Sequence, residues 1–136
     1  MALECEIIYE TSIPIPFQVA QASAIPKGSL LVLSDPMTVA ITTGDTDAII
    51  GIAAEEKKAN VGTSIAVYMT GIFKGYAGAA GVTCGMAIIS DTATGAANEL
   101  VVADVNSEHI VGMALETATD TESFRFQLNP IAVQLA

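Results

Sequence analysis

The fold is decided by two stretches that share one pattern, Ile50-Gly51-Ile52-Ala53-Ala54-Glu55 and Val111-Gly112-Met113-Ala114-Leu115-Glu116. Taken alone, residues 48–59 would suit a helix, because Ala, Glu and Lys are good helix formers. The second copy, however, leads into the alternating residues 124–128, which are typical of a strand. We therefore predict strands in both copies, with at most one turn of helix at residues 55–59.

The pattern belongs to a longer internal repeat. Lys27-Gly28 followed by an apolar run and Ser34-Asp35 returns as Cys84-Gly85 followed by an apolar run and Ser90-Asp91. The alternating stretch Ile65–Met69 returns as Phe124–Leu128. We expect an all-β chain with minor helix: a compact β-barrel-like or β-tulip-like domain built from two similar β-rich halves.

Two glycine-rich or proline-bearing segments leave alternatives open. Residues 71–81 contain four glycines and would form either a flexible connection or a strand that another backbone approaches closely. Residues 129–136 are apolar after Pro130 and would form an edge strand or a second arm. The predicted organisation is an extended arm at 1–24 and a β-rich domain at 25–136, with halves at about 25–73 and 82–130.

The N-terminal segment is apolar and rich in proline. Ile7-Ile8-Tyr9 suits a short strand, and Ile13, Pro14, Ile15, Pro16 and Phe17 form an extended stretch, because proline fixes φ and lacks an amide donor. Such an arm could lie along the surface of another protein. It could equally pack back on its own domain, and the residues do not decide between the two.

Composition excludes several classes of function. The 136 residues carry a formal net charge of −10 with only five basic residues, so no basic patch for nucleic acid or for an anionic membrane is available. No basic segment precedes an apolar one at the N-terminus, so we expect no signal peptide. With 51% hydrophobic and 15% charged residues, we expect a surface that is partly rich in Thr, Ser, Ala and Gly and partly covered by another chain.

The residues that carry chemistry are sparse and scattered. The lone histidine, His109, has no catalytic serine elbow with it, and Cys84, beside Gly85, suggests a buried, inert thiol. We expect Cys5 and Cys84 to be reduced thiols, with a disulfide as the alternative. We expect no catalytic residues, no metal, no cofactor and no enzymatic activity.

Two acidic patterns also have ordinary structural explanations. Gly44-Asp45-Thr46-Asp47 lacks the later glycine and closing glutamate of a calcium loop. Asp35 and Asp91 sit at matching places in the repeat, where Ser-Asp pairs bond the local backbone in turns.

The chain resembles the small capsid decoration, or head-stabilising, proteins of tailed phages and related viruses. The likeness lies in residues 24–31 (Ala-Ile-Pro-Lys-Gly-Ser-Leu-Leu), 34–38, 50–57 and 66–73, and in the second half from Gly85 through 111–114 to 128–130. It spans about residues 13–130. The matching residues maintain a fold and form no single diagnostic motif.

The resemblance implies a structural protein of the virion, assembled in the host cytoplasm. Its relatives are typically homotrimers that bind the outside of the expanded capsid at three-fold positions and stabilise contacts between major capsid subunits. The arm would bind the capsid protein by strand addition through Ile13, Pro14, Ile15, Pro16 and Phe17. The alternative is another phage structural component, such as a fibre base or a tail accessory protein.

Overall fold

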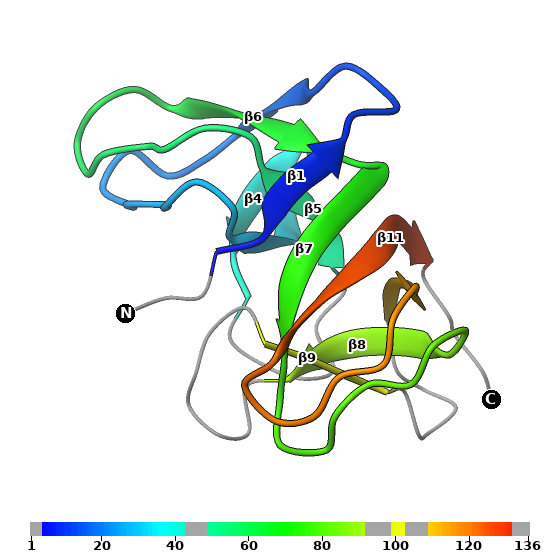
Figure 1. The fold of residues 1–136 in the computed structure, drawn as a ribbon. Helices are drawn as coiled ribbons and strands as arrows, with labels where there is room; N and C mark the ends of the chain where they lie inside the picture. Colours follow the sequence, from blue (N-terminus) through cyan, green and yellow to red (C-terminus); the bar gives the residue numbers. More distant parts are fainter. Residues whose placement is uncertain (1–3, 43–48, 92–98, 103–108, 132–136) are drawn as a thin grey trace, which may run out of the picture.

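The computed structural model describes residues 4–42, 49–91, 99–102 and 109–131. Within these ranges the chain contains eleven strands and no helix (Figure 1). The strands are β1 (Glu6–Tyr9), β2 (Ile15–Gln18), β3 (Leu30–Asp35), β4 (Thr38–Ile41), β5 (Ile49–Ala53), β6 (Ser64–Tyr68), β7 (Gly71–Ala77), β8 (Ala87–Asp91), β9 (Glu99–Val102), β10 (Ile110–Ala114) and β11 (Ser123–Ile131). The all-β prediction is confirmed.

The strands form two closed barrels of five strands each. The first barrel has the order β2-β4-β3-β5-β6, with β6 pairing back to β2. The second has the order β7-β9-β8-β10-β11, with β11 pairing back to β7. Strand β1 adds to the second barrel beside the first half of β7. In Figure 1 the first barrel lies above the second.

The two barrels repeat the same pairings strand for strand. The parallel pair β2–β4 in the first barrel corresponds to the parallel pair β7–β9 in the second, and every other neighbouring pair is antiparallel. A single bridge outside the strands also recurs, Ile25 with Lys57 and Val82 with Ala118. The prediction of two similar β-rich halves is confirmed. At the level of strands the halves are 15–68 and 71–131, so each begins with a strand that the expected halves lacked.

The glycine of the repeated pattern is needed for close approach of two strands. A Cβ added at Gly51 would overlap the carbonyl oxygen of Tyr68 on β6, and one added at Gly112 would overlap that of Gln127 on β11. No side chain larger than hydrogen fits without separating the strands. Glycine at this position of the pattern therefore indicates close pairing of two strands and not a helix.

The glutamate of the pattern ties the end of one strand to the next. The carboxylate of Glu55 accepts a hydrogen bond from the Ala66 amide at 3.1 Å, and that of Glu116 accepts one from the Arg125 amide at 2.8 Å. No helical turn forms at 55–59, because the backbone of Lys57 pairs with Ile25 instead. The turn of helix that the sequence allowed is absent.

The two interiors are filled by different residues at equivalent positions. The first barrel buries Phe17 on β2 and Val67 on β6. The equivalent pair in the second barrel is Gly75 on β7 and Phe126 on β11, as the strand registers show. A Cβ at Gly75 would lie 2.8 Å from the Phe126 ring. The large side chain is thus on β2 in the first barrel and on β11 in the second, and each interior is filled.

One side of the first barrel packs on one end of the second. Leu30, Ile49 and Ile52 on the outside of the first barrel belong to the apolar core that fills the second. The rings of Tyr68 and Phe73 meet edge to face across this junction, with centroids 5.7 Å apart. The junction is thus a continuous apolar contact between two barrels of one chain.

The N-terminal segment lies against its own domain in this structure. Strand β1 pairs with β7, and β2 closes the first barrel against β6. The ammonium of the buried Lys57 donates to the carbonyl oxygens of Gln21 and Ser23 at 2.9 and 2.8 Å, and so holds the following loop. This arrangement is the second of the two that the sequence left open. Ordering of the segment on a partner stays a prediction.

Three smaller expectations also have outcomes. The glycine-rich stretch forms a strand with close packing, β7. The tail extends β11 to Ile131, whereas residues 132–136 and the acidic stretch at 44–47 lie outside the described residues. The expectation that Cys84 is buried is wrong, since it occupies the turn before β8, where its amide bonds Thr117 and its side chain faces solvent.

Candidate interaction surface

The outside of the barrels carries a set of exposed apolar side chains. They are Ile8, Tyr9, Ile13, Ile15, Leu33, Met37, Val61, Met86, Met113 and Leu115. Single exposed apolar residues are ordinary on any protein, so what matters is where they gather. Two places stand out, the entry to β2 and the outer face of β10.

The five residues predicted to bind a partner are split by the barrel wall. Ile13 is 81% exposed and Ile15 is 44% exposed, whereas Phe17 is 5% exposed and fills the first barrel. Pro14 is half-buried and Pro16 exposed. Phe17 therefore cannot enter a pocket on another protein while the barrel is closed, and the outward-facing part of the segment is Ile13 to Pro16.

The prolines determine which edge of β2 can pair. The Val19 amide donates to Thr63 beyond β6, and the Gln18 amide donates to Met37 on the opposite side. Alternate amides of a strand point the same way, so the nitrogen of Pro16 faces the side of Gln18. That side offers no donor at Pro16, and β4 pairs with β2 only at Gln18. Pro16 thus explains why this edge stays open, and it makes the edge a poor template for an added strand.

The loop that carries Ile13 is held by hydrogen bonds to the end of β6 and to the β6–β7 connection. The hydroxyls of Thr11 and Ser12 both bond that of Thr70, at 2.9 and 2.7 Å. The Tyr68 hydroxyl donates to Glu10 at 3.1 Å. Desolvation raises the pKa of Tyr68, and its hydrogen bond with Glu10 raises it further. Ile13 is therefore held outward by a loop bonded to the β6–β7 connection.

The second place is a shallow groove over the second barrel. It has a volume of about 310 Å³ and runs across the outer faces of β8, β10 and β11. Its lining is Gly85, Ala87, Ile110, Gly112, Met113, Gln127 and Asn129. The lining carries no charged side chain, and Met113 is 40% exposed. Sequence reasoning missed this groove, because Met113 fits the pattern position that Ile52 fills in the core.

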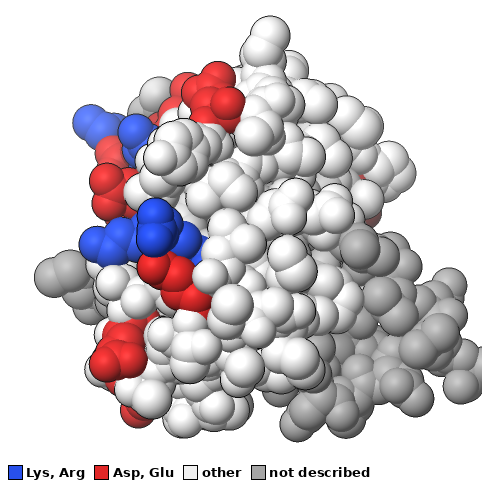
Figure 2. All heavy atoms as spheres, turned by 45° about the vertical axis from the view of Figure 1, so that its right-hand side comes forward, with Lys and Arg blue, Asp and Glu red and all other residues white. Residues whose placement is uncertain are grey.

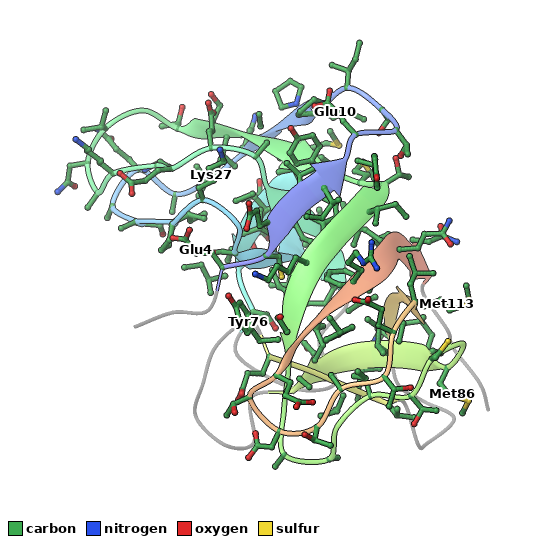
Figure 3. The ribbon with its side chains drawn as sticks, viewed as in Figure 1. Glu4, Glu10, Lys27, Tyr76, Met86 and Met113 are labelled. Atoms are coloured by element: carbon green, nitrogen blue, oxygen red, sulfur yellow. The ribbon has the colours of Figure 1, made fainter. Side chains whose placement is uncertain are left out.

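The charged side chains are distributed unevenly. Figure 2 shows a broad uncharged area on the side that lies to the right in Figure 1, with acidic and basic groups gathered toward the other edge. Met86 and Met113 project on the uncharged side (Figure 3). Among the described residues of a chain with a net charge of −10, one side thus carries little charge.

The described residues bring no metal-binding set together. No group of three or more His, Cys, Asp or Glu residues in these ranges could hold a metal ion. Cys5 and Cys84 are both free thiols, and burial raises the pKa of Cys5 to about 12. His109 is half-buried at the start of β10 and has an interaction partner. Nor do the described ranges contain a helix that could cross a membrane.

Comparison with known proteins identifies the family. The phage cement protein family matches residues 10–128, from the loop before β2 to Leu128 of β11. The chain belongs to this family. The match includes all ten barrel strands of this chain, with β11 up to Leu128. This phage cement protein is accordingly a structural, capsid-associated protein of a phage.

A solved structure shares the fold. It is described as the head fiber gp8.5 N base in bacteriophage phi29, and it has 16% sequence identity and a TM-score of 0.57 with this chain. The alignment covers 90% of this chain and 98% of that one. The double-barrel arrangement therefore occurs in a second phage head protein. No curated protein sequence matches this one.

Proposed function

We propose that this cement protein is a capsid decoration protein that acts as a homotrimer. It binds the outer surface of the expanded capsid at three-fold positions and stabilises contacts between neighbouring major capsid subunits. It works by binding and catalyses no reaction. Its location is the exterior of the virion, after assembly in the host cytoplasm.

The observation that carries this proposal is the family match across both barrels. Two features of the surface support it. Met113 lies on strand β10, and Ile13 lies on a loop held by hydrogen bonds to Thr70, so little conformational entropy is lost when they bind. The acidic remainder disfavours nucleic acid and anionic membranes, and it leaves protein as the favoured partner.

Within this proposal, the capsid contact is centred on Ile13, at the outermost point of the predicted segment. Ile13 is the most exposed large apolar residue of the described chain, and its loop is held by hydrogen bonds rather than by burial. It can therefore enter an apolar pocket on the capsid without unfolding the first barrel. The open edge at Pro16 favours side-chain contact over strand addition at that residue.

Co-sedimentation with purified capsids tests the function. Wild-type protein should sediment with expanded capsids and saturate at a stoichiometry that matches their three-fold positions, and it should not sediment with unexpanded procapsids. Ile13→Asp should weaken binding at least about tenfold, since an interface hot spot is worth about 1.4 kcal/mol or more. Val61→Asp, at another exposed apolar site in the loop between β5 and β6 (62% exposed), should bind normally. Equal binding by the two variants would refute the contact at Ile13, and failure of wild-type protein to bind expanded capsids would refute the function.

A second candidate is the base of a fibre attached to the phage head. The fold match to a head fibre base favours it. The two candidates differ in what lies above the bound protein. Electron microscopy of labelled virions should show density that ends at the two barrels for a decoration protein, and a protruding shaft for a fibre base.

A further inference from the structure

The groove around Met113 is the second barrel's copy of a surface that the first barrel has already buried. In the first barrel the equivalent positions are Leu30, Ile49, Ile52 and Tyr68, and they pack on the second barrel. In the second barrel the same positions, in the same strand register, are Ala87, Ile110, Met113 and Gln127, and they line the open groove. The surface is thus buried on the first barrel, and the equivalent surface is exposed on the second.

The complementary surface is also duplicated. Within the chain, the side of the first barrel rests on the end of the second, where Phe73, Val111 and Leu128 are buried. The equivalent end of the first barrel carries Ile15, Ile50 and Met69. Ile15 is exposed, and Ile50 and Met69 are half-buried. This second end has no barrel seated on it.

The turns at Gly28 and Gly85, which lie at the edges of the two equivalent surfaces, also differ in whether they are covered. Gly28 has φ +84°, and a Cβ there would fall 2.7 Å from the carbonyl oxygen of Cys5 and 2.9 Å from the Cβ of Glu4. Gly85 has nearly the same φ, +85°, and nothing lies within 4 Å of an added Cβ. The turn is covered in the first barrel and bare in the second, so there is room beside Gly85 for another chain.

We propose that a second copy of this chain docks on the Met113 groove with the open end of its first barrel, in a contact that repeats the internal junction between the barrels. This inference rests on the proposed self-association and names its surface. Both halves of the contact are present on every copy, and none of the described residues covers either of them. The groove also lies on the side where the described residues carry little charge, so a second copy meets few like charges there (Figures 2 and 3).

Such a contact is head-to-tail, because it joins two different surfaces. Head-to-tail contacts give a ring when the rotation closes and an open filament when it does not. A closed ring of this chain would alternate internal and intermolecular barrel junctions. The number of copies in the ring is then set by the rotation that relates one barrel to the next.

Site-directed cross-linking tests the arrangement. Tyr68 and Phe73 meet across the internal junction with ring centroids 5.7 Å apart, and their equivalents across the proposed contact are Gln127 and Ile15. In a Cys84→Ser background, the variant with both Ile15→Cys and Gln127→Cys should be joined by a short bismaleimide into a ladder that ends at the closed ring. Either cysteine alone should give no cross-linked dimer.

Sedimentation velocity over a range of concentrations gives an independent readout. Met113→Asp should raise the dissociation constant of the oligomer at least about tenfold, because it places a carboxylate in an apolar contact. Val61→Asp should leave the constant unchanged, and circular dichroism should show that both variants are folded.

Three results would overturn the inference. They are a strict monomer for the wild-type protein at every concentration, cross-linking by single cysteines, and an oligomer that Met113→Asp does not weaken. Failure of an intact oligomer to bind capsids would refute the proposed function and leave this contact standing. The two proposals can therefore fail separately.

Discussion

Whether Gly75 leaves room for the Phe126 ring can be tested by enlarging the side chain at position 75. Gly75→Ala adds one methyl group at a site where a Cβ would lie 2.8 Å from the Phe126 ring and 3.1 Å from Leu100. Gly75 has no positive φ, so alanine meets no backbone strain there. Any loss of stability must then come from crowding of the interior.

The magnitude follows from two opposing contributions. Overpacking costs roughly 1–3 kcal/mol, and replacing glycine in the unfolded chain offsets about 0.4–1 kcal/mol of that. We expect a net loss of about 1–2 kcal/mol for Gly75→Ala. Phe126→Leu leaves a partly filled cavity beside Phe73 and Phe124, whose rings contact it, and should by itself cost about 1–3 kcal/mol.

The double variant decides the matter. With leucine in place of Phe126, the methyl group added by Gly75→Ala occupies the space that the ring has left, so the double variant should be no less stable than Phe126→Leu alone. The coupling energy should be about 1 kcal/mol or more, measured by urea unfolding of all four proteins. Additivity to within about 0.5 kcal/mol would show that Gly75 and Phe126 do not share space, and the reasoning about the interior would fail.

Three further predictions concern the titratable side chains. Lys57→Met should lose about 1–3 kcal/mol in urea unfolding, because the carbonyl oxygens that its ammonium satisfies remain partly buried, and an unchanged midpoint would contradict that role. In a thiol-labelling assay at pH 8, Cys84 should react at once and Cys5 only as the chain unfolds. The raised pKa of Cys5, about 12 against an ordinary 9.0, stabilises the fold below pH 9, and this contribution should fade as the pH rises toward 12. The hydrogen bond from the Arg125 side chain lowers the pKa of Glu116. The ionised carboxylate should therefore stabilise the fold at neutral pH, and this stabilisation should be lost as the pH falls through the lowered pKa. Glu116→Gln should flatten this part of a plot of Tm against pH.

The repeat made most of the fold predictable, but it did not decide the two strands that open the barrels. Residues 13–17 were expected to be extended, and residues 71–81 to form either a flexible connection or a strand. Strand β2 contains Pro16, and β7 contains Gly75, and each residue argues against a strand on propensity alone. Pro16 is tolerated because its nitrogen faces an edge with no partner. Gly75 is tolerated because Phe126 takes its space. In both cases the reason lies in a neighbouring strand, which a local reading of the sequence does not contain.

Partner binding by residues 13–17 stays a prediction, and the structure adds only which of them face solvent. Ile13 and Ile15 are exposed, whereas Phe17, in the same alternation, is buried because β2 closes the first barrel. Met113 could not be separated from Ile52 by pattern, because both follow the glycine of the repeat. Burial at this position depends on which barrel has a neighbour, and that is a property of the assembled chain.

A chain with two barrels of one topology risks a particular error as it folds, because either opening strand could insert into either partner sheet. The differing side chains at equivalent positions guard against it. If β2 entered the second barrel, Phe17 would collide with Phe126, and if β7 entered the first, Gly75 would leave a void beside Val67. The difference in side-chain size thus favours each opening strand in its own barrel. The divergence of the two halves disfavours the exchanged arrangement.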